Sequence, residues 1–268
     1  MAIEDKPNLG PRQPFKENLK PVDFKNNPEM DRKIFHLLDS SPDKIIRLMD
    51  GLSHNDLESI KVFKGILETL KSHGINIPQV DLFAAEIKSR NPNMVASVEK
   101  VEGPNLAQLM LKPQSVEDKL FTAKLIEDLY IKLTEYLIAT EALNITFMYD
   151  IYKPGDYVYG RVKGDTEDKI YLVDIDPIFH QTRPLPYDLF LNEDEAIHNM
   201  DANRQDNLEV RLSYVAHLIV MIEKKIGVKF EKLRLNLKGI MKINPNNRSV
   251  KYLLHELERK EQKINSSI

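Results

Sequence analysis

Residues 146–177 of the chain read TFMYDIYKPGDYVYGRVKGDTEDKIYLVDIDP, and this stretch decides the fold. An acid, Asp150, is followed by a Lys-Pro pair and a polar loop. The apolar segments YVYGRV and KIYLVDI then flank a Lys-Gly-Asp turn at 163–165. Two such segments around a turn of this kind predict a β-hairpin. A second acid, Asp174, follows the apolar run at 171–173, so acidic residues stand at both ends of the predicted hairpin.

Metal-assisted phosphate transfer is the chemistry that these acids suit. It needs one carboxylate to orient the attacking hydroxyl and another, on a separate strand end, to hold the divalent cation that bridges the phosphates. Asp150 has the place of the first and Asp174 that of the second, and Asp156 lies between them along the chain. Simpler interpretations stay open, because Asp150 would also cap a helix end and Asp174 would also end a strand.

The composition limits the class of protein. A chain of 268 residues suits one large domain or two small lobes. The formal net charge is −3, so no basic field argues for a nucleic-acid partner. Cysteine is absent, which excludes disulfides and thiolate metal sites. Apolar runs such as LIVMI at 218–222 are too short to span a bilayer, and no secretion signal opens the chain, so we expect a cytoplasmic protein with no membrane partner.

The first part of the chain contains one ambiguous segment and one clear helix. Residues 1–30 are rich in Pro, Asn and Lys and predict an extended or mobile arm. Residues 33–51 allow two interpretations: KIFHLL and KIIRLM form a hairpin, or Ser41 starts a helix. Apolar residues at helical spacing predict a helix over 55–73.

The remaining segments complete an α+β pattern. VDLFAAEI at 80–87 and MVASVEKV at 94–101 predict two strands around a turn. A long amphipathic helix with an S-x-x-D cap is predicted over 115–142. Two further helices are predicted over 207–225 and 250–261. A mixed first half and a mostly helical second half are typical of the α+β class.

This order of elements resembles the protein kinase-like superfamily over residues 33–261. The loop around Asp150 is similar to the family's catalytic loop, and the strand before Asp174 to its metal-binding strand. The resemblance implies a two-lobed protein kinase-like fold: an arm at 1–30, a reduced β-rich N-lobe at 31–102 and a helical C-lobe at 103–268. The segment INPNNRSV resembles the family's C-terminal signature and gives Arg248 the role of a structural arginine.

The resemblance also implies a site for ATP and Mg²⁺. It gives a catalytic role to Asp150 and Lys153. It makes Asp156 and Asp174 the metal ligands. Around the nucleotide it places Arg47, Glu68, Glu99, Lys100 and Val101.

Each of these roles follows from a position in the family pattern. Asp150 would accept the proton of the substrate hydroxyl, and Lys153 would contact the γ-phosphate. The backbone from Glu99 onward would bind adenine. Arg47, on the third strand, would contact the phosphates and pair with Glu68 or Glu58. A solvated helix face explains Glu68 equally well, since Lys61 and Lys64 lie on the same helix.

The chain departs from the family pattern at several points. No glycine lies between Gly10 and Gly51, where the family has a glycine-rich phosphate loop. Arginine stands at position 47, where lysine is usual, and arginine is a wider, planar donor. Tyr149 and Asp150 replace the usual His-Arg-Asp, and Asp174-Ile175-Asp176 replaces Asp-Phe-Gly.

Three functions remain open. The first is an atypical phosphotransferase that moves the γ-phosphate of ATP to a hydroxyl, with a protein substrate or partner as one possibility. The second is a pseudokinase, which would keep the fold as a binding or allosteric scaffold. The third is an α+β interaction module whose resemblance to the family is accidental.

Overall fold

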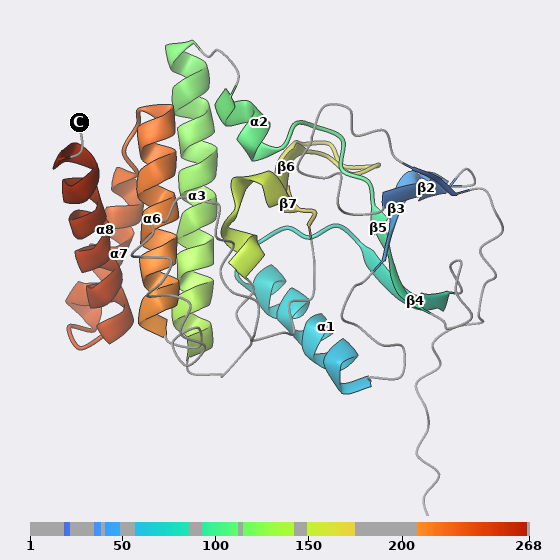
Figure 1. The fold of residues 1–268 in the computed structure, drawn as a ribbon, viewed down its shortest axis with the longest axis horizontal. Helices are drawn as coiled ribbons and strands as arrows, with labels where there is room; N and C mark the ends of the chain where they lie inside the picture. Colours follow the sequence, from blue (N-terminus) through green and yellow to red (C-terminus); the bar gives the residue numbers. More distant parts are fainter. Residues whose placement is uncertain are drawn as a thin grey trace, which may run out of the picture.

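The computed structural model describes residues 19–21, 35–38, 41–48, 57–85, 93–111, 115–141, 149–174 and 208–266. These residues form a mixed α+β structure, which confirms the expected class. A sheet lies at one end of the molecule and a group of long helices at the other (Figure 1). Of the expected N-terminal arm only residues 19–21 are described, and Asp176 lies outside the described residues.

Five strands form the larger, antiparallel sheet, in the order β1-β2-β3-β5-β4. They are β1 (Leu19–Pro21), β2 (Phe35–Leu38), β3 (Ser41–Leu48), β4 (Val80–Ala85) and β5 (Asn93–Glu99). Because β2 and β3 pair, the hairpin interpretation of residues 33–51 is confirmed and the helical one is wrong. The backbone of β3 is bonded on both sides, to β2 and to β5, and local helix signals cannot offset two ladders of hydrogen bonds.

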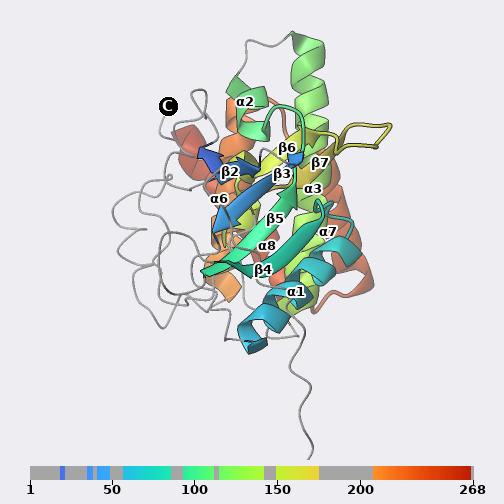
Figure 2. The ribbon, with the colours of Figure 1, turned by 90° about the vertical axis from the view of Figure 1, so that its right-hand side faces the viewer.

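Helix α1 (Leu57–Ser72) follows the third strand and confirms the helix expected over 55–73. Its apolar face is fully buried at Phe63 and Leu70. These side chains share one core with Ala96 and Val98 of β5, so α1 packs beside the sheet (Figure 2). The turn that follows the helix contains Gly74, whose φ of 76° lies in the left-handed region that glycine favours.

A second hairpin lies between the sheet and the helices (Figure 1). It consists of β6 (Tyr157–Gly160) and β7 (Lys169–Leu172), preceded by the short helices η2 (Tyr149–Tyr152) and η3 (Pro154–Asp156). The hairpin expected in the stretch that opened the sequence is therefore confirmed. Asn76 joins it to the chain after α1: the Leu172 N–H donates to the Asn76 carbonyl at 2.9 Å, and the Asn76 amide donates to Ile170 O at 2.9 Å.

The rest of the described chain is helical. Helices α2 (Leu106–Leu111), α3 (Val116–Glu141), α6 (Leu208–Ile226), α7 (Glu231–Ile243) and α8 (Arg248–Ser266) make up this part. The expected cap of α3 is confirmed, because the Asp118 N–H donates to Ser115 Oγ at 3.1 Å and the Ser115 N–H donates to Asp118 Oδ2 at 3.2 Å. Within the described ranges, no helix is both long enough and apolar enough to cross a membrane.

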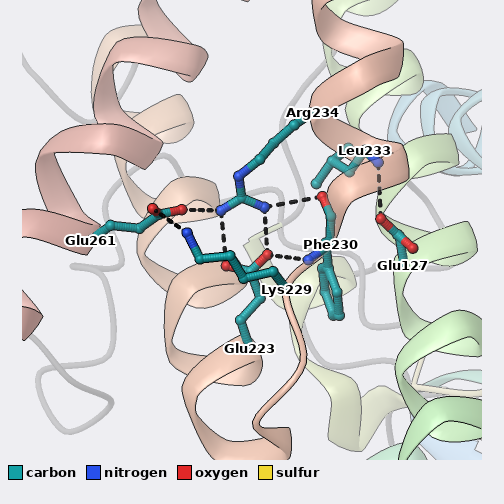
Figure 3. Close-up of polar contacts among 7 residues, drawn as sticks. All are labelled: Glu127, Glu223, Lys229, Phe230, Leu233, Arg234 and Glu261. Atoms are coloured by element: carbon teal, nitrogen blue, oxygen red, sulfur yellow. Dashed lines mark hydrogen bonds and ion pairs between the residues drawn. The ribbon is translucent and has the colours of Figure 1, made fainter.

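A buried charge network holds the last three helices together (Figure 3). The guanidinium of Arg234 in α7 donates to both oxygens of Glu223 in α6 and to Glu261 in α8. The side chains of Arg234 and Glu223 are only 12% and 6% exposed. Arg248, the arginine expected to have a structural role, is exposed at the start of α8. The arginine that joins the three helices is therefore Arg234.

Candidate functional site

Two acidic residues far apart in the sequence meet at the open end of the second hairpin. Asp156 ends η3 just before β6, and Asp174 comes just after β7. The carbonyl of Asp156 accepts hydrogen bonds from the N–H groups of Val173 (2.9 Å) and Asp174 (3.3 Å). Both acidic residues are buried, with exposed fractions of 9% and 8%. The two carboxylates therefore belong to one small region whose backbone is fixed by the hairpin.

Buried tyrosines fix the loop that leads into this region. The hydroxyl of Tyr130 in α3 donates to the carbonyl of Tyr152. The hydroxyl of Tyr157 donates to Ile151 O at 2.6 Å, and that of Tyr152 donates to Leu133 O at 3.3 Å. All three tyrosine side chains are at most 1% exposed. These bonds hold the loop between Asp150 and Asp156 against helix α3.

The charge of Asp156 acts on these tyrosines. Burial, the neighbouring phenol of Tyr214 and the carboxylate of Asp156 raise the pKa of Tyr130 well above its ordinary value. Burial and the same carboxylate likewise raise the pKa of Tyr157. Both hydroxyls therefore stay protonated at neutral pH and remain hydrogen-bond donors.

Replacing Tyr157 by phenylalanine is expected to lower the free energy of unfolding by about 1–3 kcal/mol, because a buried carbonyl loses its donor. Urea unfolding followed by circular dichroism measures this change. The matched control is Tyr159→Phe in the same strand, since no hydrogen bond of the Tyr159 hydroxyl is found among the described residues. Equal losses in both variants would show that the Tyr157 hydroxyl does not anchor the loop.

The two expected catalytic residues lie in the anchored loop. Asp150 belongs to η2, and its side chain lies outside the described part of the structure. Lys153 stands between η2 and η3, is half-buried, and its carbonyl accepts the N–H of Asp156 at 3.1 Å. Lys153 and Asp156 are therefore neighbours in one tight turn, and Asp150 lies just before this turn, within the short helix η2.

The expected adenine-binding segment follows β5. The N–H of Glu99 donates to Gln79 O at 3.0 Å, and that of Lys100 donates to Asp43 O at 2.7 Å, so neither is available to a ligand. Val101 differs, because neither its N–H nor its carbonyl takes part in a backbone hydrogen bond found among the described residues. Of the three expected positions, Val101 is therefore the one whose N–H has no backbone partner among the described residues.

The expected ion pair joins Arg47 on β3 to Glu68 on α1. Arg47 lies on β3, where its backbone is paired with Phe35 on one side and Ala96 on the other. Its side chain is outside the described part of the structure. Glu68 lies on α1 with a side chain that is 76% exposed, and its carboxylate is 3.8 Å from Lys71 Nζ. Glu68 is thus part of the solvated helix face that the sequence left open as an alternative.

The acids at 156 and 174 fit a divalent cation of the magnesium type. Carboxylate oxygens are the ligands that Mg²⁺ prefers, and one or two of them suffice when water and phosphate oxygens complete the octahedron. Among the residues that the structure describes, no group of three or more potential metal ligands is found, so an all-protein cage is not present there. The donor set of Asp156 and Asp174 suits a cation that is shared with a phosphate.

Sequence reasoning missed the parts of the site that come from distant elements. Tyr130 lies in α3, and its contact with the loop at Tyr152 joins residues that have no local pattern in common. Asn76, which bonds to β7, carries no motif either. No protein-family model and no curated protein sequence matches the chain.

Proposed function

We propose that this protein is an atypical protein kinase-like phosphotransferase that moves the γ-phosphate of ATP to a hydroxyl group. The observation that carries the proposal is the meeting of Asp156 and Asp174 at the open end of the β6–β7 hairpin. Two buried carboxylates on segments that backbone hydrogen bonds join, next to the turn that contains Lys153, suit the binding of a cation and phosphate oxygens.

The arrangement of the elements also supports a two-lobed kinase-like architecture. Helix α1 follows the third strand of the sheet, and the fifth strand leads into the segment that contains Val101. The resemblance gives Arg47 a place on the third strand, and β3 is the third strand of the described sheet. The long helix α3 then leads toward the loop with Asp150, as the long helix before a catalytic loop would.

The residues have distinct roles in this proposal. Asp156 and Asp174 hold Mg²⁺, which when bound neutralises phosphate charge. Lys153 contacts the γ-phosphate, and Asp150 orients the acceptor hydroxyl and takes its proton. The backbone of Val101 binds adenine. Because positioning and charge neutralisation supply most of the catalysis of phosphoryl transfer, the replaced loop residues are compatible with activity.

A pseudokinase is the second candidate, and one observation favours it. Glu68 is exposed and paired with Lys71 on its own helix, so it does not act as the acid that fixes a phosphate-contacting side chain on the sheet. No glycine lies between Gly10 and Gly51, and so a glycine-rich phosphate loop is absent from that segment. Such a protein would bind nucleotide without transferring phosphate.

Calorimetric titration with ATP tests both candidates. We expect wild-type protein to bind ATP more tightly with Mg²⁺ than with EDTA. In the Asp174→Asn variant the affinity with Mg²⁺ is expected to fall by at least about tenfold, since even the partners of metal ligands contribute that much. The matched control is Asp168→Asn, which removes an exposed carboxylate from the same hairpin and should leave the affinity unchanged.

The outcomes separate the candidates. Magnesium-dependent binding that is lost only in Asp174→Asn supports the phosphotransferase and justifies a search for the acceptor. Binding that does not depend on the metal supports the pseudokinase. An absence of nucleotide binding in the wild type contradicts both and leaves the interaction module.

A further inference from the structure

A cavity lies outside the acid-rich site, where three parts of the chain meet. Its volume is about 600 Å³, and its walls are the connector at 102–104, helices α2 and α3, and the hairpin from Tyr159 to Asp168. The volume lies in the range of natural ligand sites. Neither Asp156, Asp174 nor Val101 lines it, so the cavity is made of other residues than those of the proposed nucleotide site.

The cavity is built on a rigid frame. The N–H of Glu102 donates to Arg161 O at 3.0 Å, the N–H of Arg161 donates to Glu102 O at 3.3 Å, and the N–H of Tyr159 donates to Pro104 O at 3.0 Å. These bonds hold the connector against β6 in direct backbone contact. The cavity is therefore a fixed feature of the fold and not a gap between mobile side chains.

Part of the lining of the cavity is apolar. Phe121 and Tyr159 meet edge to face with 5.5 Å between their ring centres, and Pro104 and Leu109 also line the cavity. Phe121 is 48% exposed. It belongs to a row of exposed large apolar side chains at the junction of α2 and α3, which are Leu111, Val116, Leu120 and Phe121. Four of the six such residues in the described chain lie at this junction, and exposed apolar residues gathered in one region are typical of an interaction surface.

Another part of the lining is acidic. Glu102, Asp118 and Asp168 form it, against a single basic lining residue, Arg161. That arginine is held by Asp168 at 2.9 Å, and Lys100 outside the cavity offsets part of the charge of Glu102 at 3.6 Å. The Asp118 carboxylate is fixed by the hydroxyl of the capping serine at 2.8 Å. An excess of fixed carboxylates is complementary to a cation.

We propose that this cavity is a docking site for an extended segment of a partner protein that carries a large apolar side chain next to lysine or arginine. The apolar side chain fills the space against Phe121 and Tyr159, and the cationic side chain reaches Asp118 or Asp168. A peptide fits better than a small metabolite, because the apolar row continues past the cavity along α3 to Val116. The partner segment would lie along this row.

Selection from phage-displayed random nonapeptides on the immobilised full-length protein tests the proposal. We expect the enriched peptides to combine a large apolar residue with adjacent lysine or arginine. A synthetic, fluorescein-labelled copy of an enriched peptide is then titrated by fluorescence anisotropy. Phe121→Ser should weaken its binding by about tenfold or more, as truncation of an interface aromatic does.

A second variant and a control keep the result interpretable. Asp168→Asn removes one carboxylate and releases Arg161, so it should weaken binding and reduce its dependence on salt. Leu235→Ser is the matched control, since Leu235 is 67% exposed on α7, away from the cavity. The proposal is overturned if no peptide is enriched, if the enriched peptides are acidic, or if Phe121→Ser and Asp168→Asn bind them as tightly as Leu235→Ser does.

Discussion

Replacing Arg234 by methionine is expected to lower the free energy of unfolding by about 3–5 kcal/mol, which is the cost of leaving a buried charge without its partner. Arg234 is the only basic side chain seen to contact Glu223 among the described residues, and Glu223 is 6% exposed. Methionine fills most of the space of the arginine stem, so the loss comes mainly from the uncompensated carboxylate. Urea unfolding at neutral pH measures the change.

A surface ion pair supplies the control. Lys232, two residues away, pairs with Asp128, and both side chains are substantially exposed, at 64% and 39%. Lys232→Ala should cost at most about 1 kcal/mol, because solvent screens such a pair. Adding Glu223→Gln to Arg234→Met should restore part of the stability, since the amide oxygen still accepts the Phe230 N–H. Equal effects of Arg234→Met and Lys232→Ala would show that the network is not buried in solution.

The same network sets part of the acid sensitivity. Burial opposes the charged form of Glu261, but hydrogen bonds from Lys229 and Arg234 hold its pKa below the ordinary value of 4.5. The stabilising contribution of Glu261 is therefore present above that ordinary value and is lost as the pH falls through the lower pKa of the folded state. In Arg234→Met this acid-dependent loss of stability should become smaller.

The helices show what local sequence can and cannot predict. Helix α3 was predicted over 115–142 because its apolar spacing and its cap agree. Helix α7 was missed, although Leu233 and Leu237 are fully buried on one face. The reason is Leu235, which lies between them: three leucines at every second residue imitate a strand, and the exposure of Leu235 becomes known only from the packing.

The candidate site was predictable to the extent that it is local. The predicted hairpin starts directly after Asp156 and its second strand includes Asp174, and the pairing of Tyr157 with Leu172 brings these two residues to the same end of the hairpin. The exposed position of Glu68 was not decided by the sequence, because the helical pattern of charges suits either face. The anchoring of the loop by Tyr130 depends on a long-range contact that no local pattern encodes.

Replacing Gly160 by alanine is expected to destabilise the protein by about 3 kcal/mol or more, from steric overlap and from lost hydrogen bonds. A Cβ atom on Gly160 would lie 1.9 Å from the carbonyl oxygen of Glu102, and one on Gly103 would lie 2.1 Å from that of Tyr159. Both obstacles are backbone atoms, so no side-chain rotation relieves the overlap. The connector and β6 would have to separate, which breaks the pair of bonds between Glu102 and Arg161.

The control for Gly160 is a glycine with room around it. Gly65 lies inside α1 with no atom within 4 Å of an added Cβ, so Gly65→Ala should raise the free energy of unfolding by about 0.5–1 kcal/mol. The two substitutions add the same methyl group, and opposite signs in urea unfolding would isolate the backbone contact as the cause. A Gly160→Ala variant as stable as the wild type would contradict the close approach of the connector to β6. That result would also contradict the rigid frame on which the docking cavity depends.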